Sequence, residues 1–116
     1  MSRQDRWIYL LIIVAAGAAY LPTVQPVISA SNLSYFTDVG SVQDALNLWG
    51  TLHSSGYPLF SLTGAAFVSL LKLIGVVPAA AASLFSTVWA IAALIMFYAF
   101  IKTWLNDRWI ALLATL

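Results

Sequence analysis

The sequence predicts an all-α fold, a polytopic helical membrane protein, from its composition and from the spacing of its apolar segments. Of 116 residues, 62% are hydrophobic and only 8% are charged, and the mean hydropathy is +0.92. Because a soluble domain carries about 25% charged residues, this chain has too few charges to cover a water-exposed surface. The apolar residues gather in segments long enough to cross a bilayer, and a more polar stretch separates them.

Composition also excludes several classes of function. The net charge is +1 and no basic cluster is present, so we expect no binding of nucleic acid. The chain has no cysteine, which excludes disulfides, a thiolate nucleophile and a Cys-ligated metal site.

The first predicted transmembrane span covers residues 7–27, about 31 Å of helix at 1.5 Å per residue. No charged residue occurs between Arg6 and Asp38, and Trp7 stands where an interfacial aromatic residue is expected. Pro22 replaces the small residues of a signal-peptide cleavage site, so we interpret the segment as an uncleaved anchor. This proline is expected to kink or end the helix.

The second predicted span covers residues 79–101, which are apolar and uncharged. Residues 102–108 form a short hydrophilic link, and residues 109–116 begin a third span. Because a span needs about 20 apolar residues, we expect the chain to be the N-terminal part of a longer polytopic protein. The alternative is a short interfacial tail.

Residues 28–78, between these spans, are predicted to form an extracytoplasmic loop with two amphipathic helices, over 41–49 and 59–74. The first has apolar residues at helical spacing and is expected to end at Gly50. The second measures only about 24 Å, short of the roughly 30 Å hydrocarbon core. It carries one stripe of large apolar residues and a smaller, more polar stripe of Ser61, Ala65, Ser69 and Lys72. We therefore expect it to lie in the interface.

The distribution of cations favours the same topology. If the segment 59–74 lies in the interface, Arg3, Arg6, Lys102 and Arg108 share one side and only Lys72 lies on the other. If it crosses, Lys102 and Arg108 lie on the side of the loop. The positive-inside rule favours the first arrangement, with a cytoplasmic N-terminus in the plasma (inner) membrane or an equivalent one. Residues 35–58 are extracytoplasmic in both arrangements.

The loop 35–58 concentrates ionisable side chains. It contains the only histidine, His53, and two of the four acidic residues, Asp38 and Asp44. Asp38 can act as a general base or bind a divalent ion, or it can be the N-cap of the helix that follows. Asp44 follows Ser41 by three residues, which is a capping-box pattern. His53 has no partner at metal-ligand spacing, so by itself it is better interpreted as a polar loop residue.

Two spaced motifs carry a resemblance to a known family. They are Asp38-Val-Gly-Ser41 and Trp49-Gly-Thr-Leu-His53-Ser-Ser-Gly-Tyr-Pro-Leu-Phe60, followed by a helix, a proline and a second span. This resembles the N-terminal part of GT-C-type membrane glycosyltransferases related to protein O-mannosyltransferases. Their pattern reads roughly Asp-x-Gly-Glu, a spacer helix, then His-Pro-Pro-Gly-Tyr-Pro-Leu-Tyr. The resemblance covers about residues 7–101 and implies GT-C-like transmembrane helices with extracytoplasmic juxtamembrane helices.

The resemblance implies an activity and roles for particular residues. The family transfers a sugar from a polyprenyl-phosphate carrier to an extracytoplasmic acceptor, which is a protein, a lipid or a glycan. Asp38 would be the general base, or would position a divalent metal ion together with His53. His53 would shape the site of the donor phosphate or the metal. Gly56, Tyr57 and Pro58 would shape the turn that binds the donor.

The chain also departs from the family pattern. Ser41 stands where the second acid is usual, Ser54-Ser55 replace the two prolines, and Ala81 stands where an arginine is expected. The alternative function is therefore a non-catalytic small membrane subunit or scaffold protein whose loop docks a partner. Many further spans downstream would favour the enzyme, and a natural stop would favour the subunit.

Overall fold

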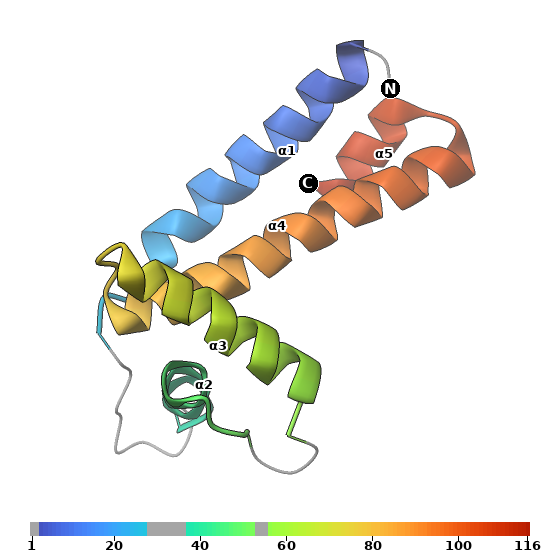
Figure 1. Cartoon of the computed structure of the whole chain (residues 1–116). Coiled ribbons are helices and arrows are strands. Elements are labelled where there is room, and N and C mark those ends of the chain that lie inside the picture. The colour runs from blue at the N-terminus through green and yellow to red at the C-terminus, as the bar shows by residue number, and fades with distance from the viewer. Residues whose placement is uncertain (1–2, 28–36, 53–55) are drawn as a thin grey trace. The chain divides into compact units, whose positions relative to one another are not determined.

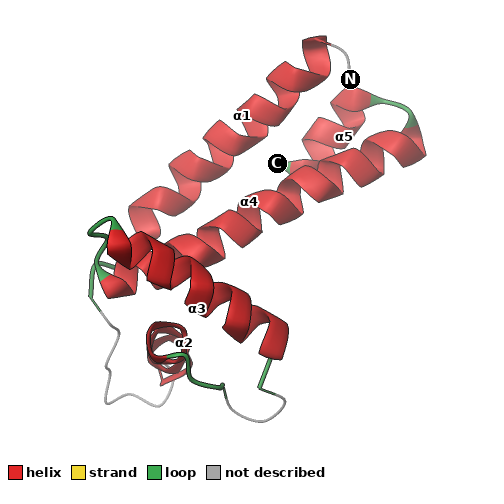
Figure 2. Cartoon of the chain, viewed as in Figure 1, coloured by secondary structure: helices red, strands yellow, loops and turns green. Residues whose placement is uncertain are grey.

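The computed structural model describes residues 3–27, 37–52 and 56–116. Over these residues the chain is helical and contains no strand, so the predicted all-α class is confirmed (Figures 1 and 2). The elements are α1 (Arg3–Tyr20), the 3₁₀ turn η1 (Leu21–Thr23), α2 (Thr37–Leu48), α3 (Pro58–Leu73), α4 (Pro78–Leu105) and α5 (Arg108–Thr115).

Among the described residues, two helical segments are long and apolar enough to cross a membrane. They are Gln4–Thr23, with 20 residues, and Pro78–Leu105, with 28 residues. The apolar helix Pro58–Leu73 is shorter, with 16 residues. By length and composition, this part of the chain is that of a membrane protein.

The chain folds into two compact units. The terminal unit comprises Met1–Thr23 and Thr87–Leu116, and the central unit comprises Val24–Ser86. Helix α4 begins in the central unit and ends in the terminal unit.

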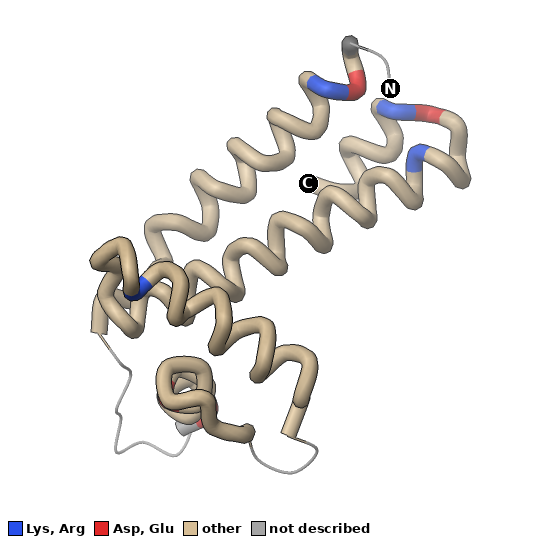
Figure 3. The backbone as a smooth tube through the Cα atoms, in the orientation of Figure 1, with Lys and Arg blue, Asp and Glu red and all other residues tan. Residues whose placement is uncertain are grey.

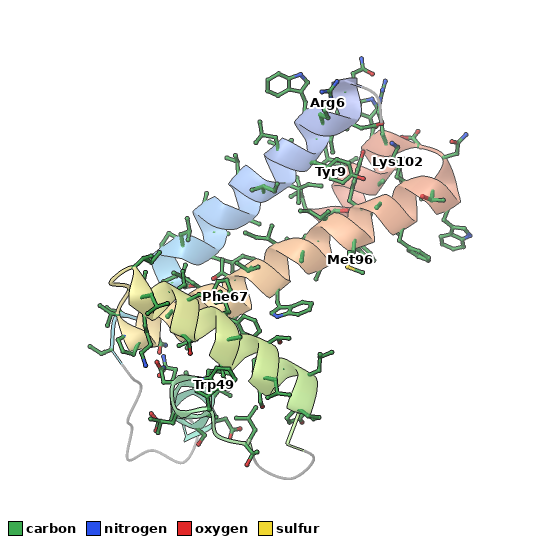
Figure 4. All side chains as sticks on the ribbon, viewed as in Figure 1. Arg6, Tyr9, Trp49, Phe67, Met96 and Lys102 are labelled. Atoms are coloured by element: carbon green, nitrogen blue, oxygen red, sulfur yellow. The ribbon has the colours of Figure 1, made fainter. Side chains whose placement is uncertain are left out.

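The core of the terminal unit lies where α1, α4 and α5 meet. Ile8 and Ile12, one turn apart on α1, pack with Tyr98, Ala111 and Leu112. The ring of Tyr9 meets that of Tyr98 edge-to-face, with the centroids 5.2 Å apart. Figure 4 shows the Tyr9 side chain directed from α1 toward the C-terminal part of α4.

Polar contacts join the start of α1 to the end of α4 in this unit. The Asp5 carboxylate lies 2.7 Å from the Lys102 ammonium. The Arg108 guanidinium at the start of α5 donates a hydrogen bond to the Gln4 side chain. Figure 3 shows these charges at one end of the unit. Helices α1 and α4 therefore run antiparallel, with Asp5 and Lys102 at the same end.

The end of α1 follows from Pro22. Helix α1 passes into the 3₁₀ turn Leu21–Thr23, which begins five residues after Ala16, the last buried residue of α1. Proline has no amide hydrogen to continue the α-helical pattern. The first helix therefore ends before residue 27, the predicted end of the span.

Helix α4 extends beyond the range predicted for the second span. It includes residues 102–105, so the hydrophilic link shrinks to Asn106 and Asp107. Lys102 lies in the last turn of α4, where a cation interacts favourably with the helix dipole, and it pairs with Asp5. Asn106 then takes a left-handed conformation with φ of 52°, and its amide donates to the Lys102 carbonyl at 2.9 Å. Asparagine tolerates this conformation better than most residues.

The core of the central unit depends on a close approach of helices at Gly64. Leu46 of α2 packs with Val68 of α3 and with Ala81, Ala82 and Phe85 at the start of α4. A Cβ atom on Gly64 would lie 2.6 Å from Leu46 Cδ2 and 2.8 Å from Phe85 Cε1. Only glycine fits there without movement of its neighbours.

Helix α3 packs through its small residues. Its buried residues are Ser61, Gly64, Ala65 and Val68, whereas large apolar residues such as Leu70 and Leu73 are exposed. Small residues let helix backbones approach closely, as they do in membrane helix interfaces. The large apolar side chains of this helix are then free to face lipid.

Candidate functional site

Asp38 lies exposed in the first turn of α2. The helix begins one residue earlier, at Thr37, so the interpretation of Asp38 as the N-cap is wrong. An acidic residue in the first turn still interacts favourably with the helix dipole. The capping-box interpretation of Ser41 and Asp44 is also wrong, because both residues lie inside α2.

The C-terminal end of α2 is fixed by Trp49 and not by Gly50 alone. Trp49 has a left-handed backbone, with φ of 56°, and the Gly50 amide donates to the Ala45 carbonyl at 2.8 Å. This is the Schellman arrangement, in which glycine usually takes the left-handed position. A non-glycine residue there costs about 1–2 kcal/mol. The Trp49 indole N–H donates to Ser69 Oγ of α3 at 3.2 Å, which helps to hold this conformation.

Side-chain amides attach the middle of α2 to the rest of the central unit. The Asn47 amide nitrogen donates to the Gln43 carbonyl at 2.8 Å and to the Pro78 carbonyl at 3.1 Å. Gln43 is itself buried and donates to the Gln25 side chain at 3.4 Å. These bonds orient α2, and with it Asp38, relative to the start of α4.

The start of α3 is a tight turn made by Gly56 and Tyr57. Both have positive φ, 67° and 41° respectively. Pro58 follows at the first helical position, where its missing amide hydrogen costs nothing. The Ser61 hydroxyl donates back to the Gly56 carbonyl at 3.0 Å and stabilises the turn.

A cavity of about 290 Å³ lies between the end of α2 and the start of α3. Its walls are formed by Trp49, Gly50, Thr51, Gly56, Pro58, Ser61, Leu62 and Ala65. Both ends of the longer sequence motif therefore line one cavity. Of the residues predicted to bind the donor, Gly56 and Pro58 line it, and Tyr57 shapes the turn beside it.

The sequence prediction missed Trp49, Thr51 and Ser61 as residues of this cavity. Trp49 stands just before Gly50, the residue at which the helix was predicted to end, and the rule for helix ends places the left-handed conformation at glycine. Figure 4 shows Trp49 beside α2 and α3. Ser61 was predicted only as a member of the smaller, more polar stripe of its helix, which did not indicate a cavity.

Asp38 and this cavity lie at opposite ends of α2. Eleven residues separate Asp38 from Trp49, which is about 16 Å along a helix axis. His53 lies outside the described residues. The described part of the chain therefore does not bring Asp38 together with Gly56 and Pro58.

No group of three His, Asp or Glu side chains that could hold a metal ion occurs among the described residues. At the predicted site they supply a single carboxylate, that of Asp38. His53, the other residue predicted to hold a metal ion, lies outside the described residues.

Comparison with known families decides the relationship. The family model for the protein O-mannosyl-transferase TMEM260 N-terminal domain matches residues 38–113. The chain belongs to this family. The match begins at Asp38 and extends through both walls of the cavity into α5. No curated protein and no solved structure matches the chain.

Membership of this family confirms the resemblance drawn from the two motifs, to the N-terminal part of an O-mannosyltransferase-related protein. The residues before Asp38, including α1, lie outside the matched range.

Proposed function

We propose that the chain is the N-terminal part of a GT-C-type membrane glycosyltransferase. It would transfer a sugar from a polyprenyl-phosphate carrier to an extracytoplasmic acceptor. The observation that carries the proposal is the family match, which contains Asp38 and both ends of the longer motif. The candidate spans Gln4–Thr23 and Pro78–Leu105 support a reaction at a membrane surface.

Asp38 is the proposed general base. Its carboxylate takes the proton of the acceptor hydroxyl while the acceptor oxygen bonds to the anomeric carbon of the sugar. The bond between that carbon and the phosphate oxygen breaks, and polyprenyl phosphate leaves with the bonding electrons. The exposed position of Asp38 in the first turn of α2 leaves the carboxylate accessible to an acceptor.

The cavity at the other end of α2 is the proposed contribution of this chain to the donor site. Gly56 and Pro58 form one wall, and Trp49 and Thr51 form the other. His53 and Tyr57 remain proposed donor-site residues on the strength of the motif. Because about 16 Å separates the cavity from Asp38, a lipid-linked donor of extended shape fits this arrangement better than a compact sugar alone.

The proposed topology has the N-terminus and residues 102–108 in the cytoplasm and residues 29–78 outside. The contacts between Asp5 and Lys102 and between Gln4 and Arg108 support it, because they hold the start of α1 and the end of α4 at one end of the terminal unit. A fully crossing α3 would put these groups on opposite sides of the membrane. Helix α3 is then interfacial, in keeping with its 16 residues.

Single-cysteine labelling tests this topology, since the chain has no native cysteine. An impermeant thiol reagent applied from outside is expected to label Ser54→Cys and to leave Asn106→Cys unlabelled until the membrane is opened. The reverse pattern, or external labelling of both, contradicts the proposed topology.

The substitution Asp38→Asn tests the function. It keeps the shape of the side chain and removes the proton acceptor, so sugar transfer should fall by about 10² to 10⁴. The loss of favourable charge at the start of α2 costs only about 0.3–1 kcal/mol, which expression level and thermal unfolding would reveal. The assay is transfer from a polyprenyl-phosphate donor by the complete protein in membranes.

The matched control is Asp44→Asn, which removes the same charge from another exposed position of α2. Transfer by this variant should stay near that of the wild type. If Asp38→Asn is as active as Asp44→Asn, Asp38 is not the base. If the wild-type protein transfers no sugar at all, the alternative of a non-catalytic subunit or scaffold, suggested by Ser41 in place of the second acid, is the better one.

A further inference from the structure

A charged cleft lies in the terminal unit, whereas Asp38 and the cavity described above belong to the central unit. It has a volume of about 450 Å³ and is lined by Asp5, Lys102, Asn106, Asp107, Arg108 and Trp109. None of these residues has a part in the proposed transfer reaction. Figure 3 shows their charges at the start of α1, the end of α4 and the start of α5.

The cleft lies where both candidate membrane spans end. Gln4–Thr23 begins beside it and Pro78–Leu105 finishes beside it. Three tryptophans at these helix ends are well exposed: Trp7 at 61%, Trp104 at 75% and Trp109 at 60%. Exposed tryptophan at the ends of membrane helices marks the headgroup layer. In either orientation of the chain, the cleft therefore opens at the level of lipid headgroups.

The charges lining the cleft balance. Asp5 and Lys102 pair with each other at 2.7 Å, and Asp5 is only 6% exposed, so this pair belongs to the structure of the unit. Arg108 and Asp107 remain, one cation and one anion on neighbouring residues. A cleft with no net charge is poorly suited to an anionic ligand and well suited to one that carries both charges.

Arg108 and Asp107 are both positioned by contacts within the unit, and each has further hydrogen-bonding groups for a ligand. One guanidinium nitrogen of Arg108 donates to Gln4, and the group lies 5.7 Å from the centre of the Trp109 ring. Its other N–H groups remain for a phosphate, which guanidinium binds in bidentate fashion. Asp107 accepts the amides of Trp109 and Ile110 through Oδ1, at 2.8 and 3.1 Å, which leaves Oδ2 for a further donor.

We propose that this cleft binds the headgroup of a zwitterionic phospholipid that carries a primary ammonium, as in phosphatidylethanolamine. Arg108 takes the phosphate and Asp107 takes the ammonium. A choline headgroup has no N–H to donate to Asp107, and a glycerol headgroup brings no positive charge. This site stands apart from the proposed function and does not depend on it.

Binding is measured by native mass spectrometry on the delipidated full chain in detergent. The probes are phosphatidylethanolamine, phosphatidylcholine and phosphatidylglycerol with identical acyl chains. The wild type should bind the ethanolamine lipid about tenfold more tightly than the choline lipid, which is the value of one charge-assisted hydrogen bond.

Substitutions test which residue binds the phosphate and which binds the ammonium of the headgroup. Arg108→Gln should weaken binding of both the ethanolamine and the choline lipid, because both carry the phosphate. Asp107→Asn should weaken binding of the ethanolamine lipid to the level of the choline lipid and leave the latter unchanged. Asparagine caps a helix nearly as well as aspartate, so α5 stays intact. The control Lys72→Gln, an exposed cation of the central unit, should change neither affinity.

Any of three results would overturn the proposal. The first is equal binding of ethanolamine and choline lipids by the wild type. The second is tightest binding of the glycerol lipid, and the third is a loss of binding in Lys72→Gln as large as that in Arg108→Gln. Because binding is read without sugar transfer, an inactive protein leaves this result unaffected. Equally, a failure of lipid selectivity leaves the role of Asp38 untouched.

Discussion

The two units of this chain differ in what fixes their helices. The terminal unit is held by large side chains and by charge: Ile8, Ile12 and Tyr98 fill its core, and Asp5 pairs with Lys102. The central unit also buries large side chains, such as Leu46 and Phe85, but its helices come together at Gly64, where a Cβ atom would lie within 3 Å of both. Added volume at a close approach of helices should destabilise the central unit. The terminal unit should instead be destabilised when a buried or paired side chain is removed.

This difference matters for function because the central unit carries Asp38 and the cavity. Its helices are fixed by close backbone approach and by amide hydrogen bonds such as those of Asn47. The terminal unit contributes candidate spans and the charged cleft. We expect the predictions below to separate the two modes of packing.

The largest effect is expected from added volume at Gly64. Gly64→Val places carbon atoms where Leu46 and Phe85 already lie, 2.6 and 2.8 Å from the first added atom. Overpacking of this kind costs about 1–3 kcal/mol, and we expect the upper end for a branched side chain. Thermal unfolding in detergent measures the loss, and sugar transfer should fall with it because α2 carries Asp38.

Two further variants check this explanation. Gly17→Val on α1 is the matched control, since the nearest atom to an added Cβ is Leu21 Cδ1 at 3.9 Å, and it should cost far less. Leu46→Val removes both Cδ atoms near Gly64, so combining it with Gly64→Ala should recover part of the stability lost by Gly64→Ala alone. A double variant no more stable than the sum of the two losses would contradict a direct clash.

Breaking the ion pair should damage the terminal unit to a smaller degree. Lys102→Met removes the ammonium that lies 2.7 Å from the buried Asp5 carboxylate, which is destabilising. We expect a lower midpoint of thermal unfolding, and we expect Asp5→Leu combined with Lys102→Met to restore most of it. Lys72→Met, which removes an exposed cation from the central unit, should leave the midpoint unchanged. If the double variant is less stable than Lys102→Met, the loss of the ammonium beside the buried Asp5 carboxylate is not the cause.

A third prediction separates lack of space from backbone strain. Gly75 has φ of 86°, but no atom lies within 4 Å of the Cβ that it would carry. Gly75→Ala should therefore cost about 1 kcal/mol through the backbone alone. Gly75→Asn should cost less than Gly75→Ala, because asparagine adopts this conformation more readily. Equal losses in the two variants would indicate another origin for the effect.

The sequence predicted the all-α class and the family well, and the local geometry less well. The apolar periodicity and the two spaced motifs are patterns of residue types along the sequence, so they can be identified without a structure. The left-handed conformation of Trp49 was not, because Gly50 is the residue that sequence rules place there. The packing of α3 through Gly64 was also not predicted, because the apolar face of this helix was predicted from its stripe of large apolar residues and not from its small ones. The start of α2 before Asp38 was not predicted either, because the residues that precede Asp38 carry no strong capping signal.

The smallest predicted effect concerns the cap of α5. Asp107 accepts the amides of Trp109 and Ile110, which have no partner within the helix. Asp107→Ala should therefore cost about 1 kcal/mol, whereas Asp107→Asn should be close to silent. Hydrogen exchange gives the sharper measurement, because the amides of Trp109 and Ile110 should lose protection in Asp107→Ala and keep it in Asp107→Asn. Amides of the central unit should be unaffected in both variants. Loss of protection in Asp107→Asn as well would mean that the charge of Asp107, and not its hydrogen-bonding oxygen, holds the start of α5, and the asparagine variant would then no longer isolate ammonium binding in the cleft.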